Sequence, residues 1–526
     1  MSDLNSEQAA VVELKNRRGA RVIIAGPGTG KTKTMVALFN ELREAGVPAA
    51  NIRAVTFSKE AATTIEKRAG IKGVFSTFHS LGYEICSSVI RKPVEPELRY
   101  RLMCQLCRKW GLQYKDLDQF ISQMRHANVS PAAAVESGKW GYAPSRAYAE
   151  YEKDRLAAGW MDFESMLCDA VAYLEDPQNR ARWQFEYLIV DEAQDTDDLQ
   201  WRMMQLLSEK HGNITVVGDP NQAIYTWRGA SPENLTNFEK WFPGGRYFYL
   251  GRNYRSTQNV VKFVRENLPS DCPPALREAM VPARAEVGAP VGIKMFWGED
   301  EEAEDALTKA QADPLNSIII ARTNRQLGVL ERLCNEHSIR YHLLGKSGFW
   351  KQGEIRKVVE ALKTYTALPL AAALNLAIPA VEKHYAVDDR TDLDNYALGN
   401  LASLKNQALK FQSTSEFVVW ANKMMHRRNG AKGVTFATVH AAKGGEWKNV
   451  FLIGARADVM PHAKGDPREE ARIYLVAISR AIDRLRISFA GTPSPYLRRY
   501  LTEDILDKLR EKADEVDSLQ AQTKLF

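Results

Sequence analysis

The sequence predicts an α/β protein built on two parallel sheets, each interrupted by a helical insertion. Three observations favour this fold class. Short apolar runs typical of buried strands alternate with helical patterns in two separate parts of the 526-residue chain. A glycine-rich turn follows the first of these runs, and acidic residues follow two others. The composition is that of an ordinary globular protein, with 45% hydrophobic and 26% charged residues, and the length suits three or four domains.

The first sheet is expected from the N-terminal half of the chain. A helix should begin near Ser6, with Asn5 or Ser6 as its cap. Strands are predicted at 21–25, 54–57, 73–75, 185–190 and 214–217. Between 89 and 181 the strand signal disappears, and amphipathic helices are predicted at 100–110, 117–127 and 148–174.

The second sheet is expected from strands at 317–320, 434–437, 450–453 and 485–488. A helix-rich segment interrupts it, and a flexible tail should begin near residue 511. The predicted organisation is a first α/β domain (1–88 and 182–250), a helical insertion (89–181), a second α/β domain (251–365 and 431–495), a second, small helical insertion (366–430), and a C-terminal helix with a tail (496–526).

Residues 25–32 lie between a predicted strand and a predicted helix and follow the pattern [AG]-x-x-x-x-G-K-[ST], with Ala25 at the first position. This pattern indicates a Walker A phosphate loop. Backbone N–H groups and the helix N-terminus would surround the phosphates. Lys31 would neutralise the β- and γ-phosphates, and Thr32 would bind Mg²⁺. The expected nucleotide-binding residues here are Gly26, Pro27, Gly28, Thr29, Gly30, Lys31, Thr32 and Lys33.

Polar residues follow two strands of the first predicted sheet, where open α/β sheets bind ligands. Asp191 and Glu192 come directly after the strand at 185–190. We assign Asp191 to the metal and Glu192 to the base that polarises the attacking water. Gln222, after the next strand, would sense the γ-phosphate or its water.

Tyr225, Trp227 and Arg228 supply two aromatic rings and a cation within four positions. The bases of a single strand stack on such platforms, at roughly 1–3 kcal/mol per base. Composition alone fits equally a core tryptophan beside a surface arginine.

The net charge of +6 is compatible with a nucleic-acid partner without requiring one. Cys104 and Cys107 form a lone C-x-x-C with no second pair at zinc spacing, which favours an apolar helix face over a metal site. The scattered cysteines favour reduced thiols in a cytoplasmic compartment. No apolar run reaches membrane-spanning length.

The motifs occur in the order seen in the UvrD/Rep-type helicases of superfamily 1, which the chain resembles along nearly its whole length. The resemblance rests on Gln8, the phosphate loop, the runs at 77–80, 191–194, 218–230 and 253–256, and on two later runs, 438–447 and 474–481, that are similar to the family's fifth and sixth motifs. It implies two RecA-like motor domains of the P-loop NTPase class. It also implies a cytoplasmic ATP-dependent DNA helicase, encoded by a bacterium or its phage, that travels 3′→5′ on single-stranded DNA.

The resemblance also assigns roles by position. Gln8 would read the adenine edge, Tyr254 would stack on the ring, and Glu446 would contact the ribose. Arg255 and Arg480 would be arginine fingers acting on the γ-phosphate. Residues expected along the single-strand track are Phe57, His79, Tyr225, Trp227, Arg228 and His440. His79 and His440 could instead be buried, hydrogen-bonded histidines.

The chain departs from the family pattern in two places. Gly445 stands where the fifth motif usually has leucine, which removes a packing side chain and loosens the backbone beside Glu446. The second insertion spans only about 65 residues, which predicts weaker autoinhibition or a different partner requirement.

The last five residues resemble the Q-x-x-L-F peptide with which bacterial-type replication proteins dock on the sliding clamp. Leu525 and Phe526 would be the apolar anchors and Gln522 the polar contact. Other functions compatible with the motifs are a translocase that strips proteins from single-stranded DNA without unwinding, and an ATP-gated DNA-binding scaffold. RNA also remains possible as the substrate.

Overall fold

The computed structural model describes residues 4–13, 18–56, 62–63, 65–67, 70, 73–87, 92–345, 350, 352–384, 392–409, 411–426, 433–463 and 465–507. Phe57, the side chain of Arg228, and the predicted clamp-binding residues 522–526 lie outside the described parts. Among the described residues, no helix is long and apolar enough to cross a membrane.

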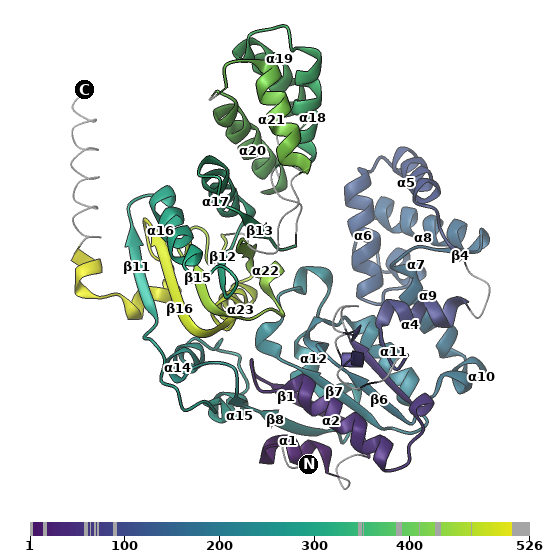
Figure 1. Cartoon of the computed structure of the whole chain (residues 1–526). Helices are drawn as coiled ribbons and strands as arrows, with labels where there is room; N and C mark the ends of the chain where they lie inside the picture. The colour runs from purple at the N-terminus through teal and green to yellow at the C-terminus, as the bar shows by residue number, and fades with distance from the viewer. Residues whose placement is uncertain are drawn as a thin grey trace. The chain divides into compact units, whose positions relative to one another are not determined.

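The chain forms two compact units (Figure 1). Residues 1–254 and 270–283 belong to the first unit, and residues 255–269 and 284–526 to the second. The division differs from the expected break after residue 250. Residues 252–253 (β9) pair with 281–282 (β10), and α15 (Pro274–Ala279) packs on the last strand of the first sheet, so both stay with the first unit.

Six parallel strands form the first sheet, in the order β3-β2-β6-β7-β1-β8. They are β1 (Arg21–Ala25), β2 (Ile52–Thr56), β3 (Phe75–Thr77), β6 (Tyr187–Val190), β7 (Ile214–Gly218) and β8 (Arg246–Leu250). The strand expected at 73–75 begins only at Phe75, because Gly73 has a φ of 82° and cannot continue a strand. The edge strand β8 was not expected from the sequence.

The helices of the first sheet pack its apolar side chains into a core. Ile23 and Ala25 of β1 and Ile189 of β6 meet Met35 and Phe39 of α2 in one buried cluster. The helices of this part are α1 (Ser6–Val12), α2 (Lys31–Glu44), α4 (Phe78–Ser87), α11 (Asp198–Ser208), α12 (Glu233–Thr236) and α13 (Phe238–Trp241). Asn5 caps α1 through a capping box with Gln8.

The insertion between β3 and β6 is helical, as expected, apart from the two-residue pair β4 (Lys92–Pro93) and β5 (Trp160–Met161). Its helices are α5 (Pro96–Trp110), α6 (Tyr114–His126), α7 (Pro131–Glu136), α8 (Tyr142–Ala157), α9 (Ser165–Glu175) and α10 (Pro177–Arg180). The single helix predicted at 148–174 is wrong. The chain turns at Gly159, whose φ is 68°, so α8 and α9 are separate helices. Cys107 is buried on α5 and all six cysteines are free thiols.

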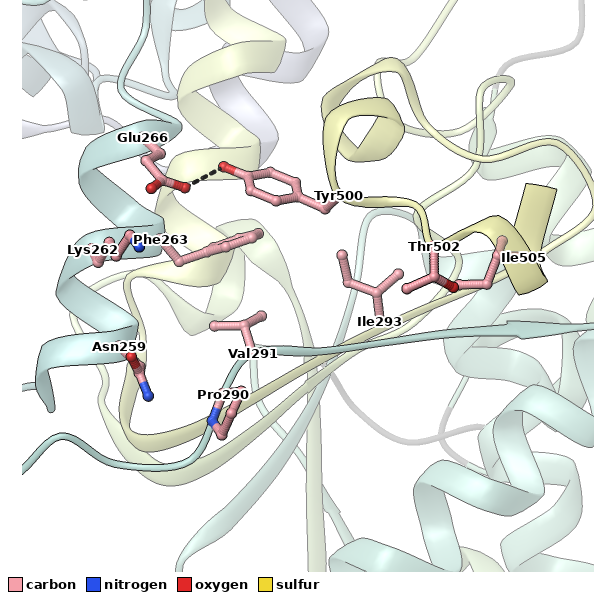
Figure 2. A pocket seen from close by; sticks show the side chains of 10 residues that line it. All are labelled: Asn259, Lys262, Phe263, Glu266, Pro290, Val291, Ile293, Tyr500, Thr502 and Ile505. Atoms are coloured by element: carbon pink, nitrogen blue, oxygen red, sulfur yellow. Dashed lines mark hydrogen bonds between the residues drawn. The ribbon is translucent and has the colours of Figure 1, made fainter.

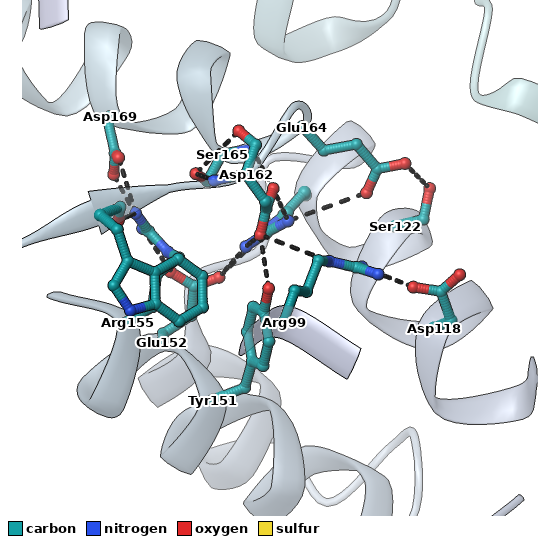
Figure 3. A network of polar contacts seen from close by, with 12 residues as sticks. Arg99, Asp118, Ser122, Tyr151, Glu152, Arg155, Asp162, Glu164, Ser165 and Asp169 are labelled. Atoms are coloured by element: carbon teal, nitrogen blue, oxygen red, sulfur yellow. Dashed lines mark hydrogen bonds and ion pairs between the residues drawn. The ribbon is translucent and has the colours of Figure 1, made fainter. Parts of the chain in front are cut away.

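A buried ionic network joins the helices of this insertion (Figure 3). Arg125 pairs with Asp162 at 2.9 Å and with Glu152 at 2.5 Å. Arg155 pairs with Glu152 and Asp169, both at 2.7 Å. Burial acts to raise the pKa of Asp162, but Arg125 and the other donors outweigh it and lower that pKa to about 2. Each buried charge therefore has a partner from another turn or helix.

Removing one member of the network should weaken the insertion strongly. Arg125→Ala leaves Glu152 and Asp162 without their shared cation, and we expect a cost of about 3–5 kcal/mol. Amide hydrogen exchange across 92–180 measures the loss. The matched control is Arg101→Ala, whose pairing with Glu97 joins side chains that are 68% and 67% exposed and should contribute less than about 1 kcal/mol. Equal effects of the two variants would contradict the expectation.

Six parallel strands also form the second sheet, in the order β11-β16-β15-β12-β14-β13. They are β11 (Gly292–Phe296), β12 (Ser317–Ala321), β13 (Tyr341–Leu343), β14 (Val434–Thr438), β15 (Trp447–Leu452) and β16 (Ala481–Ala490). The four expected strands are confirmed, and the edge strands β11 and β13 are additions. Its helices are α14 (Gln258–Glu266), α16 (Glu299–Gln311), α17 (Asn324–Glu336), α22 (Val439–Ala442) and α23 (Pro467–Ile478).

Four helices form a separate apolar cluster between β13 and β14. They are α18 (Gly353–Thr364), α19 (Leu370–Glu382), α20 (Asp392–Ala408) and α21 (Thr414–His426). Ile355 and Val358 of α18 share the core with Leu374 and Phe417. The helical insertion was predicted to begin at residue 366. In the structure its first helix, α18, begins earlier, at Gly353. Near the C-terminus a 3₁₀ helix, η8, spans Pro495–Tyr500.

Candidate functional site

A glycine-rich loop at 26–30 joins β1 to the N-terminus of α2. Gly28 and Gly30 have positive φ angles of 69° and 81°, which glycine adopts without strain. A β-carbon on Gly30 would lie 2.8 Å from Nε2 of Gln8. No side chain caps α2 at Gly30, so the start of this helix offers backbone N–H donors to an anion.

Lys31 lies over this loop. Its Nζ donates hydrogen bonds of 3.2 Å to the carbonyl oxygens of Ala25 and Gly26. Thr29 Oγ1 also donates to Gly26 O, at 2.8 Å. An anionic phosphate is a stronger acceptor for an ammonium group than these carbonyls, so the loop can exchange them for a ligand.

Two residues expected at the nucleotide base lie beside the loop. Gln8 Nε2 donates to Thr29 O at 3.0 Å. The Tyr254 backbone N–H donates to Gly28 O at 2.9 Å, and its phenol oxygen accepts from Asn5 Nδ2 at 2.6 Å. The structure therefore brings Gln8 and Tyr254 to the phosphate loop from opposite ends of the first unit's sequence.

The carboxylates after β6 sit at the carboxyl edge of the first sheet. Asp191 is buried, and its Oδ1 accepts the N–H of Glu192 at 2.9 Å. Glu192 has a φ of 52°, a strained value for a residue with a β-carbon. Burial and the neighbouring Glu192 carboxylate raise the pKa of Asp191, and Lys31 acts in the opposite direction. A buried carboxylate beside a second, half-buried one favours a bound cation.

Gln194 connects the ends of β6 and β7. Its Nε2 donates to the carboxylate of Glu192, and its Oε1 accepts the N–H of Asp219 at 3.0 Å. Gln222 is buried and donates to Asp219 Oδ2 at 2.6 Å. These bonds hold Glu192 and Gln222 in set orientations at the same edge of the sheet.

The donor set fits a magnesium-bound triphosphate. The Thr32 hydroxyl and the Asp191 carboxylate are hard oxygen donors, and Mg²⁺ is commonly held by one or two such groups together with phosphates. Across the described ranges, no three His, Cys, Asp or Glu side chains are grouped so that they could hold a metal by themselves.

The second unit gathers three of the expected residues in one place. Arg255 Nε pairs with Glu446 Oε2 at 2.5 Å. Arg480 is buried and donates to Val476 O at 2.9 Å and to Gly445 O at 3.2 Å. Both guanidinium groups are thus held next to the segment 445–446.

Packing explains why a glycine, and not a larger residue, stands at position 445. A β-carbon there would lie 2.2 Å from Cη2 of the Trp447 indole ring. The indole occupies the space where a larger residue at 445 would project. The expected loss of a packing side chain is therefore offset by Trp447, two residues further along.

The residues expected along the single-strand track have different surroundings. Trp227 is 63% exposed, so the core-tryptophan alternative is wrong. It lies with Arg228 on the 3₁₀ helix η6 (Thr226–Arg228), directly after Tyr225. His440 is half-buried on α22.

His79 lies at the start of α4 and is half-buried. Its ring stacks on Phe163 with centroids 4.1 Å apart and planes 10° from parallel. Burial lowers the pKa of His79 to about 4, with Asp197 acting against the shift and His126 adding to it. A pKa of about 4 keeps the ring neutral at physiological pH.

Sequence reasoning missed several supporting residues. Phe163 is 65% exposed and widens the platform of His79. Asn253 Nδ2 donates to Pro27 O at 2.8 Å and holds the phosphate loop from outside it. Met280 lies behind Gly26, where a β-carbon would be 3.1 Å from its Cε. Asn253 belongs to the run 253–256 that carries the resemblance, but no role was assigned to it from the sequence.

A phosphate loop after β1, a carboxylate pair after β6 and two parallel sheets define a P-loop NTPase. The family models for the UvrD/REP helicase N-terminal domain and the UvrD-like helicase C-terminal domain match residues 4–243, and 248–375 with 405–492. The chain therefore belongs to the UvrD/Rep-type DNA helicases of superfamily 1, and its two sheets are the RecA-like domains of that family.

Similar curated proteins come from several bacteria. The ATP-dependent DNA helicase UvrD2 of Mycobacterium tuberculosis is 28% identical over 547 residues, covering 91% of this chain and 77% of that protein. PcrA of Bacillus subtilis is 23% identical over 657 residues, with coverages of 98% and 88%. Rep of Buchnera aphidicola is 28% identical over 393 residues, with coverages of 68% and 60%.

Proposed function

We propose that this protein is an ATP-dependent DNA helicase that moves 3′→5′ along single-stranded DNA and separates duplex ahead of it. The observation that carries the proposal is the phosphate loop with Lys31 at the same sheet edge as Asp191, Glu192 and Gln222. Family membership supports DNA as the polymer. Replication, repair or recombination would be its setting, in a bacterial cytoplasm.

The first unit would bind and hydrolyse ATP. Gln8 and Tyr254 would hold the base, Lys31 the β- and γ-phosphates, and Thr32 with Asp191 would hold Mg²⁺, which supplies charge neutralisation when bound. Glu192 would accept a proton from the attacking water. The hydrogen bond from Gln194 would orient the Glu192 carboxylate. The hydrogen bond from Gln222 to Asp219 would keep the Gln222 amide at the same edge of the sheet.

Arg255 and Arg480 of the second unit would stabilise the negative charge that develops on the transferred phosphoryl group. Their contacts around 445–446 link both guanidinium groups to the segment that carries Glu446, the expected ribose contact. The arginines lose their anionic partner on phosphate release, which would couple the state of the nucleotide to motion of the unit.

The single strand would be held by stacking and phosphate contacts, so binding would not depend on sequence. His79 with Phe163, and Trp227 with Tyr225, offer aromatic faces in the first unit. Arg228, His440 and Phe57 are proposed as further contacts from the resemblance.

Tailed substrates test this function. A fluorescent partial duplex with a 3′ single-stranded tail should be unwound in the presence of ATP and Mg²⁺, whereas the same duplex with a 5′ tail should not. Matched RNA substrates serve as the second comparison, and Lys31→Ala as the inactive control. Preference for the 5′ tail would contradict the polarity. ATP-driven translocation without strand separation would identify a protein-displacing translocase instead.

We further propose the sliding clamp as a partner through Gln522, Leu525 and Phe526. The support is the sequence pattern alone. Purified clamp immobilised on resin should retain the full chain and lose it when residues 522–526 are deleted. Equal retention of both proteins would remove the proposal.

A further inference from the structure

Strand β11 is an outer strand of the second sheet. It pairs with β16 from Gly292 to Phe296, and in the described part of the chain no strand pairs with its other side. In a parallel sheet, alternate residues of an outer strand direct their backbone N–H and C=O groups away from the neighbour. β11 therefore has main-chain groups available for one more strand.

One face of β11 borders a pocket of about 310 Å³ with a mixed lining, in which apolar residues lie beside Lys262 and Glu266 (Figure 2). Val291 and Ile293 point into it from the β11 segment, and Phe263 points into it from α14. Phe263 packs on Tyr500 with ring centroids 4.7 Å apart, and Tyr500 donates a 3.0 Å hydrogen bond to Glu266. The one acidic group lining this pocket is therefore engaged, and an apolar side chain fits the space.

The other face of β11 borders a cationic pocket of about 380 Å³, which contacts α16, β15 and β16. Its charged lining consists of Lys294, Lys309, Arg484, Arg486 and Asp305. The two lysines share Asp305. Within the described ranges, neither arginine forms an ion pair. Four cations against one carboxylate leave an excess of positive charge in a concave site.

The two pockets match the alternation of a strand. Successive residues of an extended chain point to opposite faces. Val291 lines only the first pocket, Gly292 and Lys294 line only the cationic one, and Ile293 borders both. A segment paired with β11 would place every second side chain in the cationic pocket. The remaining side chains would enter the first pocket, beside Phe263 and Val291.

We propose that β11 is a docking edge for an extended segment of a partner protein, with acidic side chains at alternate positions and apolar side chains between them. Main-chain hydrogen bonds to β11 would give affinity, and the two pockets would give specificity. A protein segment is favoured over nucleic acid because Phe451, the aromatic residue lining the cationic pocket, is 6% exposed and offers no stacking face.

Fluorescence anisotropy with two labelled nine-residue peptides tests this surface. One alternates glutamate and valine, and the other alternates lysine and valine. We expect the full chain to bind the glutamate peptide about tenfold more tightly at low salt, because charge complementarity favours it. Arg484→Glu should remove most of this preference. Arg484 is exposed and lies outside the proposed helicase machinery, so unwinding should be retained.

Two controls separate this docking from general charge effects. Arg468→Glu makes the same charge change at another exposed arginine of the second unit and should leave peptide binding unchanged. A glutamate peptide N-methylated at alternate amides cannot complete the strand ladder and should bind about tenfold more weakly. Unfolding midpoints for both variants show whether the fold is intact.

Several results would overturn the proposal. They are equal binding of both peptides, unchanged binding by Arg484→Glu, and equal loss in Arg468→Glu. Binding that appears only after removal of residues 508–526 would make the chain's own segment the occupant. A dimer that Arg484→Glu dissociates would make a second copy the occupant. Either of these last two results would exclude a partner protein as the normal occupant.

Discussion

Lys31→Ala should lower DNA-stimulated ATP hydrolysis by roughly 10²–10³-fold or more, because the variant lacks the cation that meets the charge on the phosphates. In the structure Lys31 makes two carbonyl contacts of 3.2 Å, which are weak enough that the fold should tolerate its loss. Single-stranded DNA binding should persist, since the proposed stacking residues lie elsewhere. The measurements are steady-state phosphate release with and without DNA, and anisotropy of labelled DNA.

The matched control for this variant is Lys240→Ala, which removes an exposed lysine on α13 of the same unit. It should keep both activities. ATP hydrolysis retained by Lys31→Ala would exclude the assignment of the loop. Loss of DNA binding together with hydrolysis, without unfolding, would place Lys31 on the DNA surface instead.

Arg480→Ala should lower the rate of hydrolysis at saturating ATP by about 10³–10⁵-fold, the range for a positioned arginine that stabilises transferred phosphoryl charge. Its guanidinium is held by hydrogen bonds to Val476 O, Gly445 O and Ser479 Oγ, which set the orientation of the group. The loss should appear in kcat more than in nucleotide affinity, because the charge develops in the transition state. Single-turnover hydrolysis and titration with a fluorescent nucleotide separate the two quantities.

Arg480→Lys distinguishes charge from geometry. Lysine keeps the positive charge but lacks the planar fork, so we expect hydrolysis between that of the alanine variant and that of the unmodified protein. The unfolding midpoint must be measured as well, because Arg480 is buried and its replacement leaves carbonyl oxygens without a donor. A folded Arg480→Ala protein that hydrolyses ATP within about fivefold of normal would contradict the role.

Continuous apolar runs identified the inner strands of both sheets. β1 and β12 are buried along their whole length, and a run of apolar residues is a local signal for such a strand. Within the two six-stranded sheets, the strands that the sequence did not indicate are β8, β11 and β13, and all three lie at an edge. An edge strand is partly exposed and needs no continuous apolar run, so its pattern is weaker. In β8, for example, only Leu250 is fully buried and the other residues are half-buried.

The chemistry at the phosphate loop was also predictable locally, because the glycines, Lys31 and Thr32 are adjacent in the chain. Asp191 and Gln222 could be associated with it because strand ends meet at one edge of a parallel sheet. The roles of Tyr254, Arg255 and Arg480 came from the family resemblance, and the structure supports only their local surroundings.

Contacts between residues distant in the chain needed three-dimensional packing. Asn5 reaches Tyr254, Phe163 stacks on His79, and the Trp447 indole occupies the space beside Gly445. None of these pairs has a periodic signature, since each depends on how separately formed elements meet. The motifs therefore predicted the class of chemistry and the inner sheets, whereas packing between distant segments determined the platform of His79, the support of the phosphate loop and the pockets beside β11.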